Sequence, residues 1–255
     1  MERLGRQRKS FEMNGNTLRA MGLLFMAAGA IGRGIIQNRM LGIGQMTGDQ
    51  MIAVMSASEL NMTLVTVSLI LQAMETCAVP VFALLVVEGF RYTHDWKAYL
   101  LRVLKAGLLA ELPYNVLMGS PLSSRNPMFG VAFAILLLYF YAVYEEKTLK
   151  NTLIKLVVTV ASIVWCEMLS IEFGAALVLV TAGFWPKRDK PLYRNLIGAT
   201  VSFLCTLISP FFMAAPMSFL VIHFYNGEQS TTSRKVNYLA YPVLLFAACA
   251  AVLAF

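Results

Sequence analysis

The chain has 255 residues, of which 58% are hydrophobic and only 14% are charged, and its formal net charge is +7. An ordinary soluble domain has about 25% charged residues, so this composition lacks the polar material for a water-exposed surface. Its apolar residues come in long continuous blocks, which excludes a transmembrane barrel because barrel strands alternate over about 10 residues. The composition therefore predicts an all-α, polytopic integral membrane helix bundle.

The apolar blocks predict about nine membrane-spanning helices, since a bilayer core takes roughly 20 apolar residues per helix. A basic tail, residues 1–16, precedes a single transmembrane domain that covers residues 17–255. The second block is longer than one crossing requires and contains Glu75 and Pro80, so we expect it to be tilted or kinked. The predicted spans are 18–36, 62–90, 98–117, 127–144, 152–167, 169–185, 195–212, 213–225 and 237–255.

The basic residues predict the orientation of these spans. With the N-terminus in the cytoplasm and the C-terminus outside, 18 of the 21 Lys and Arg residues fall in cytoplasmic segments. Only Arg33, Arg39 and Arg125 fall elsewhere. This bias is typical of a multi-pass protein of the cell membrane. It also explains the positive charge without nucleic acid, for which the sequence has no binding motif.

The cysteine and histidine pattern does not predict a metal site. Each of the four cysteines lies alone in an apolar block, where a thiol behaves as a small hydrophobic group. The two histidines, His94 and His223, are far apart and have no partner at a ligand spacing. A capping or turn role is expected for His223, which precedes an Asn-Gly pair.

Ionisable residues inside predicted spans are candidates for function, because they are costly in a bilayer. Glu75 is expected either to be neutral or to pair with Arg33 of the first span, in a structural or a functional contact. Glu167 and Glu172 flank a predicted outer hairpin and are expected to be solvated. The densest cluster lies where the second span meets the third. There, carboxylates, a histidine and cations favour binding of a phosphorylated cofactor and proton transfer, although interfacial anchors and helix caps are an alternative. The cluster comprises Glu88, Arg91, His94, Arg102, Lys105 and Glu111.

Short sequence motifs occur within this cluster and along much of the rest of the chain. Residues 78–82 read AVPVF, and residues 87–95 read VEGFRYTHD. They are followed by YLLR at 99–102, AELPY at 110–114, RNPMF at 125–129, FYNG at 224–227 and YP at 241–242. In content and order these motifs resemble the TraX family of membrane proteins.

The resemblance implies a membrane-embedded acyltransferase of the bacterial inner membrane. The family is named for an enzyme that N-acetylates conjugative pilin, with acetyl-CoA as the presumed donor. The expected acceptor is a peptide, a glycan or a lipid. Acyl transfer needs a general base and cations that hold the CoA phosphates. We assign Glu88, His94 and Glu111 as acid–base candidates, and Arg91, Arg102 and Lys105 as the phosphate-binding residues.

The chain departs from the family pattern at three places. Gly29 and Ala30 stand where family members usually carry Asp-His, and Glu75 and Thr76 stand where they carry Gly-Arg. The family motif YPxH has Leu244 in place of its histidine. A non-catalytic binding or assembly protein on the same scaffold is therefore the alternative hypothesis. A small transporter is not supported, because the sequence shows no inverted repeat.

Overall fold

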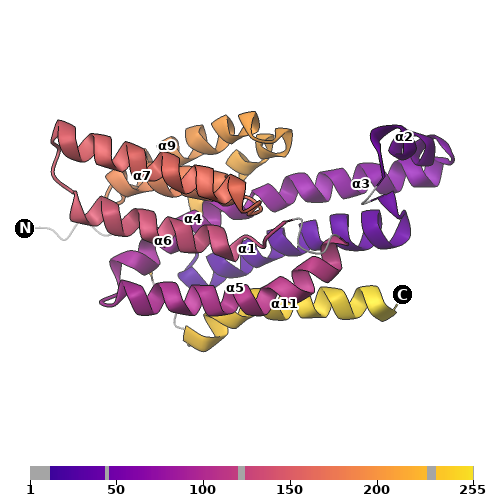
Figure 1. Ribbon diagram of the computed structural model, residues 1–255, viewed down its shortest axis with the longest axis horizontal. Coiled ribbons are helices and arrows are strands. Elements are labelled where there is room, and N and C mark those ends of the chain that lie inside the picture. The colour runs from indigo at the N-terminus through magenta and orange to yellow at the C-terminus, as the bar shows by residue number, and fades with distance from the viewer. Residues whose placement is uncertain (1–11, 44–45, 120–123, 229–233, 255) are drawn as a thin grey trace, which may run out of the picture.

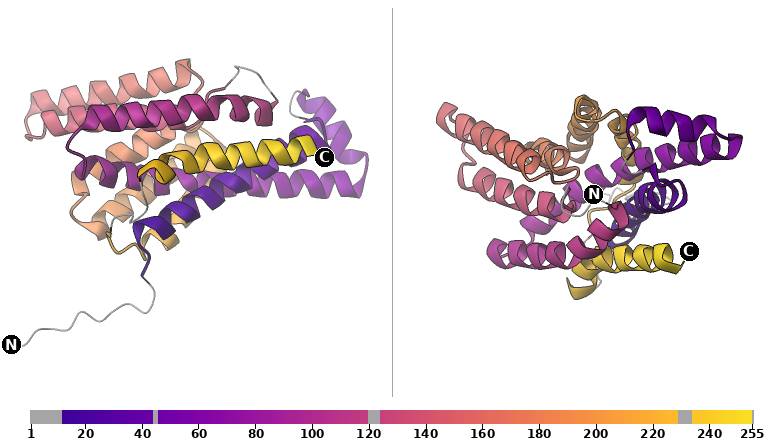
Figure 2. Two further views of the ribbon diagram at one scale, coloured as in Figure 1. Left: turned by 90° about the horizontal axis from the view of Figure 1, so that it is seen from below. Right: turned by 45° about the vertical axis from the view of Figure 1, so that its right-hand side comes forward.

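The computed structural model describes residues 12–43, 46–119, 124–228 and 234–254. Within these ranges the chain is helical and has no strand, which confirms the all-α class (Figure 1). The helices lie side by side along one long axis, with α2 at one extreme (Figures 1 and 2). The principal helices are α1 (Gly15–Gly29), α2 (Gly48–Ser56), α3 (Glu59–Thr76), α4 (Ala78–Arg91), α5 (Trp96–Met118), α6 (Met128–Val143), α7 (Leu149–Met168), α8 (Gly174–Phe184), α9 (Pro191–Leu204), α10 (Ser218–Ile222) and α11 (Arg234–Ala254).

The first predicted span lies within one continuous helical rod. Asn14 begins α1, because its side chain accepts hydrogen bonds from two backbone N–H groups of the first turn. The rod continues from α1 as a π-helix, η1 (Ala30–Met40). Gly32 lets this rod approach α3 closely, since a Cβ there would lie 2.8 Å from the Ser68 carbonyl oxygen.

The long second span is two helices, α3 and α4, that meet at Cys77. The chain bends there because Pro80 has no N–H with which to continue the hydrogen-bond ladder. The Thr76 hydroxyl donates to the Phe211 carbonyl at 3.1 Å, and the Cys77 thiol lies 3.2 Å from the Ala214 carbonyl. The break is thus fixed by a distant part of the chain.

That distant part differs from the predicted spans 195–212 and 213–225. Helix α9 ends at Leu204, and three short 3₁₀ turns, η4 (Cys205–Leu207), η5 (Pro210–Met213) and η6 (Ala215–Met217), lead into the short α10. Pro210 and Pro216 lack the N–H groups that a continuous α-helix would need. The continuous helices expected over 205–217 are therefore wrong.

The core is built around α8, whose residues are mostly buried among α4, α6, α7 and α9. Helices α6 and α8 touch through two glycines. A Cβ on Gly130 would lie 2.9 Å from the Cα of Gly174, and a Cβ on Gly174 would lie 3.0 Å from Cys166 and Ile171, so both positions are tightly packed. Helix α7 lies on the outside, with a long row of exposed apolar residues that suits contact with lipid (Figure 1).

Within the part of the chain that the structure describes, three helical segments are long and apolar enough to cross a membrane by length and composition: Gly15–Met40, Glu59–Arg91 and Leu149–Met168. Met128–Val143, Pro210–Ile222 and Val236–Val252 are shorter apolar helices. Apolar helices of these lengths support the prediction of a membrane protein. The count of nine membrane crossings remains a prediction.

Polar contacts between distant segments define two ends of the bundle. At what we call the basic end, Arg19 bonds Asn237, and Arg91 bonds Asp189. At the opposite end, Arg33 pairs with Glu172. The basic end gathers segments 12–19, 88–97, 144–150, 185–194, 222–228 and 234–237, which carry much of the positive charge used in the orientation prediction.

Candidate functional site

A cavity of about 270 Å³ lies at the basic end, between α1, α4, α5, α11 and the chain that follows α10. Its lining draws on segments more than 200 residues apart. It therefore forms only when the first and last helices pack together, as the side view of the bundle shows (Figure 2). The polar lining residues include Arg19, Glu88, Tyr99, Arg102, Tyr225, Asn237 and Tyr238.

Two arginines give this cavity its charge. Arg19 donates to the Asn237 side-chain oxygen at 2.6 Å, and the Arg102 guanidinium lies 5.6 Å from the centre of the Tyr238 ring. Among the described residues neither arginine pairs with a carboxylate. The buried Nε of Arg102 also has no hydrogen-bond partner there. Two uncompensated guanidinium groups beside tyrosine side chains suit a phosphate or another oxyanion.

Glu88 forms the charged wall of the cavity. It is buried at the junction of α4 and α9, 3.8 Å from Arg91 and 3.5 Å from Arg194. Glu88 thus lies inside the bundle beside two cations instead of facing lipid. Burial lowers the pKa of the Arg194 guanidinium and Glu88 opposes this, so the two groups stabilise each other's charge.

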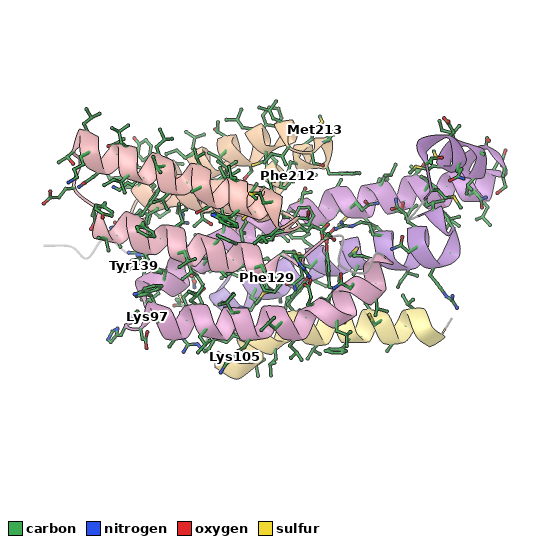
Figure 3. The ribbon with its side chains drawn as sticks, viewed as in Figure 1. Lys97, Lys105, Phe129, Tyr139, Phe212 and Met213 are labelled. Carbon is green, nitrogen blue, oxygen red and sulfur yellow. The ribbon has the colours of Figure 1, made fainter. Side chains whose placement is uncertain are left out.

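The other predicted site residues lie outside the cavity lining. His94 is exposed next to Thr93, which does line the cavity, and Arg91 lies at its rim in an ion pair with Asp189. Lys105 is exposed and points away from the bundle (Figure 3), although it is only one turn from Arg102. Of the six predicted residues, the structure thus brings Glu88 and Arg102 together in the lining.

Glu111 lies toward the opposite end of α5. Its carboxylate accepts hydrogen bonds from Arg125 at 3.0 Å and from the Asn126 side chain at 2.6 Å. Asn126 is fully buried and also donates to the Gly107 carbonyl at 2.9 Å. These contacts fix the chain that enters α6.

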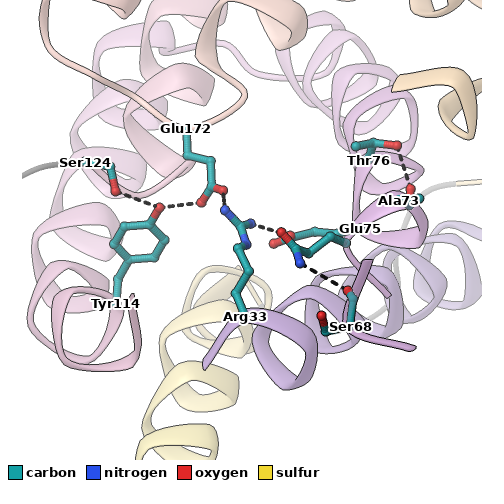
Figure 4. A network of polar contacts seen from close by, with 9 residues as sticks. Arg33, Ser68, Ala73, Glu75, Thr76, Tyr114, Ser124 and Glu172 are labelled. Carbon is teal, nitrogen blue, oxygen red and sulfur yellow. Dashed lines mark hydrogen bonds and ion pairs between the residues drawn. The ribbon is translucent and has the colours of Figure 1, made fainter. Parts of the chain in front are cut away.

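A second polar cluster, the Arg33 network, joins the helices η1, α3 and α5 to the α7–α8 turn near Glu111 (Figure 4). Arg33 lies between Glu75 and Glu172 and pairs with both, and the Tyr114 hydroxyl donates to Glu172. Ser124 lies 3.2 Å from the Tyr114 oxygen. Of the two alternatives for Glu75, a neutral carboxyl or a pair with Arg33, the structure shows the pair. The prediction that Glu172 is solvated is wrong, because the α7–α8 turn folds it inward against Arg33.

The cysteines lie in the apolar interior of the bundle. All four cysteines are buried free thiols, in agreement with their expected role as small hydrophobic groups. Among the residues that the structure describes, His, Cys, Asp and Glu form no group of three or more that could hold a metal ion.

Comparison with protein families gives a match to the model described as TraX protein, over residues 16–251. The chain belongs to the TraX family. This match extends from α1 to α11 and includes the cavity and the Arg33 network. No curated protein and no solved structure matches the chain.

The structure connects two of the departures from the TraX pattern. A Cβ at Gly29 would overlap the carboxylate of Glu75. The space for a side chain at position 29, where TraX proteins are expected to carry Asp, is here filled by a carboxylate from position 75. The glycine and the glutamate therefore depend on each other.

Sequence reasoning missed Arg19 and the tyrosines of the cavity. Arg19 counted only toward the orientation prediction, yet it lies within the first turns of α1 and faces the cavity. The available signal was that Arg19 lies inside the predicted span 18–36 instead of before it.

Proposed function

We propose that this TraX-family chain is a membrane-embedded acyltransferase that takes an acetyl group from acetyl-CoA on the cytoplasmic side. The acceptor would be a peptide, a glycan or a lipid. The supporting observation is the cavity at the basic end, where Arg19 and Arg102 have no carboxylate partner among the described residues. Cations of this kind can hold the CoA phosphates.

In this reaction an acceptor amine or hydroxyl attacks the thioester carbon. The new acyl–acceptor bond forms as the C–S bond breaks, a base takes the proton of the acceptor, and the CoA thiolate takes up a proton. Among the proposed acid–base residues, the geometry favours Glu88, which faces the cavity. His94 lies exposed near its mouth, and Glu111 is engaged with Arg125 and Asn126 at the other end.

The alternative is a binding or assembly protein without catalysis. It is favoured by the ion pairs of Glu88 with Arg91 and Arg194, because a carboxylate held between two arginines can serve to join α4 to α9 without taking part in catalysis. It is also favoured by the cavity lining, which contains no histidine among the described residues.

The test uses the full-length protein, purified in detergent. Binding of CoA and acetyl-CoA is measured by calorimetry, and turnover is measured as release of free CoA thiol. We expect micromolar-range binding of both, and loss of turnover in Glu88→Gln with binding retained. Loss of turnover in His94→Ala instead would assign the base to His94. Binding without turnover would favour the alternative, and absence of CoA binding would refute the proposal.

The proposal also fixes an orientation, because acyl-CoA is cytosolic. The basic end must face the cytoplasm, with the N-terminus inside and the C-terminus outside. Reporter fusions after residues 55, 120, 148 and 188 should read outside, outside, inside and inside. The reverse pattern would place the cavity on the wrong side for the donor.

A further inference from the structure

A small apolar cavity adjoins the cavity at the basic end. A second cavity of about 50 Å³ shares Phe82, Met128, Val131 and Tyr241 with the first, and its lining is otherwise apolar. We call this small cavity the throat. It adds Met26 of α1, which lies seven residues beyond Arg19, or roughly 10 Å further along the helix.

Phe173 connects the throat to the Arg33 network. It lines the throat, and the Arg33 guanidinium lies 5.7 Å from the centre of its ring. A ligand group in the throat would meet carbon on nearly every side, with the Tyr241 side chain contributing to the wall.

Together the two cavities suit a ligand with an anionic part at Arg19 and Arg102 and a small apolar end further in. An apolar cavity of ~150 Å³ holds benzene, with its six carbons, so by this scale ~50 Å³ takes roughly two carbons. The phosphates and the acyl group of an acyl-CoA are separated by the pantetheine arm, which matches this order of charged and apolar parts.

We propose that the throat binds the acyl group of the donor and limits it to a chain of about two carbons, with Phe82, Met128 and Val131 setting the limit. This inference rests on the proposed function, because it assumes that CoA occupies the larger cavity. Phe82 also packs closely against α1, since a Cβ on Gly22 would lie 3.1 Å from its ring. This contact holds the ring in place, so that it can limit the length of the bound acyl chain.

The experiment compares calorimetric affinities for CoA, acetyl-CoA, butyryl-CoA and octanoyl-CoA, using full-length protein in detergent. Burial of one methylene group favours binding about fourfold. We expect wild-type protein to bind acetyl-CoA at least about fourfold more tightly than CoA and octanoyl-CoA at least tenfold more weakly than acetyl-CoA.

Two substitutions with opposite effects on the size of the throat test the residues that line it. Phe82→Ala enlarges the throat and should recover most of the lost octanoyl-CoA affinity, while Val131→Phe fills it and should make acetyl-CoA and CoA bind equally. The matched control is Phe133→Ala on the same helix as Val131. Phe133 lines a separate groove with Leu104 and Leu136 and should leave the chain-length profile unchanged.

The possible results distinguish failure of the throat inference from failure of the proposed function. If CoA binds but the chain-length profile is the same in wild type, Phe82→Ala and Val131→Phe, the throat inference is overturned and the proposed function stands. If CoA itself does not bind wild-type protein, both are overturned. Should Phe82→Ala fail to fold, Met128→Ala enlarges the same space and Val131→Phe still provides the opposite change.

Discussion

Replacing Arg33 by alanine should give the largest loss of stability of any single substitution considered for this protein. Arg33 is shared by Glu75 and Glu172, so its removal leaves two carboxylates facing each other without a cation. Removal of one partner from a buried ion pair costs about 3–5 kcal/mol. For a chain of this length that corresponds to a fall of roughly 10 °C in the unfolding midpoint.

The measurement is thermal unfolding of the purified protein in detergent. Arg39→Ala is the matched control, because Arg39 lies on the same helix η1, carries the same charge and is exposed. We expect its effect to stay within about 0.5 kcal/mol. The double variant Arg33→Ala with Glu172→Gln should recover part of the loss, since it removes one of the stranded charges. Equal midpoints for Arg33→Ala and wild type would show that the network does not stabilise the fold.

Loss of CoA binding in Arg102→Ala is the second large effect that we expect. A hydrogen bond to a charged group contributes about 1.5–3 kcal/mol, which is roughly a tenfold to hundredfold change in Kd. Arg19→Ala should have an effect of the same size, because both guanidinium groups line the cavity from different helices. Arg102→Lys keeps the charge but not the planar fork, and it should retain part of the affinity.

Lys105→Ala separates the sequence-based assignment from the structural one. The spacing of Arg102 and Lys105 suggests that both face one site, whereas Lys105 is exposed and lies outside the cavity lining. Calorimetry with CoA should therefore show little change in Lys105→Ala. An equal loss of affinity in Lys105→Ala and Arg102→Ala would favour general attraction by the basic end over a defined binding cavity.

The sequence predicted the features that depend on local composition. Apolar block length gave the helical class and most of the helices, and the cost of charges in a bilayer correctly suggested the pairing of Arg33 with Glu75. The TraX motifs also identified the family, which the match over residues 16–251 confirms.

The remaining features depend on contacts between distant segments. Glu172 is a turn residue that would be solvated if the turn did not fold inward, and nothing in its neighbours indicates Arg33 as a partner. The bend at Cys77 is completed by carbonyl groups of Phe211 and Ala214, which the sequence does not place nearby. Arg19 and Arg102 meet in one cavity only because α1, α5 and α11 pack together.

The contact between Gly130 and Gly174 limits how this protein can change during evolution. A side chain at Gly130 would push α6 away from α8, because its Cβ would lie 2.9 Å from the Cα of Gly174, whereas a Cβ at Gly174 would press on Cys166 of α7 and on Ile171 at 3.0 Å. The exposed apolar face of α7 has no such constraint, since lipid accepts many apolar side chains of different shapes. Relatives that keep this architecture should therefore diverge quickly along α7 and remain fixed at this pair of glycines.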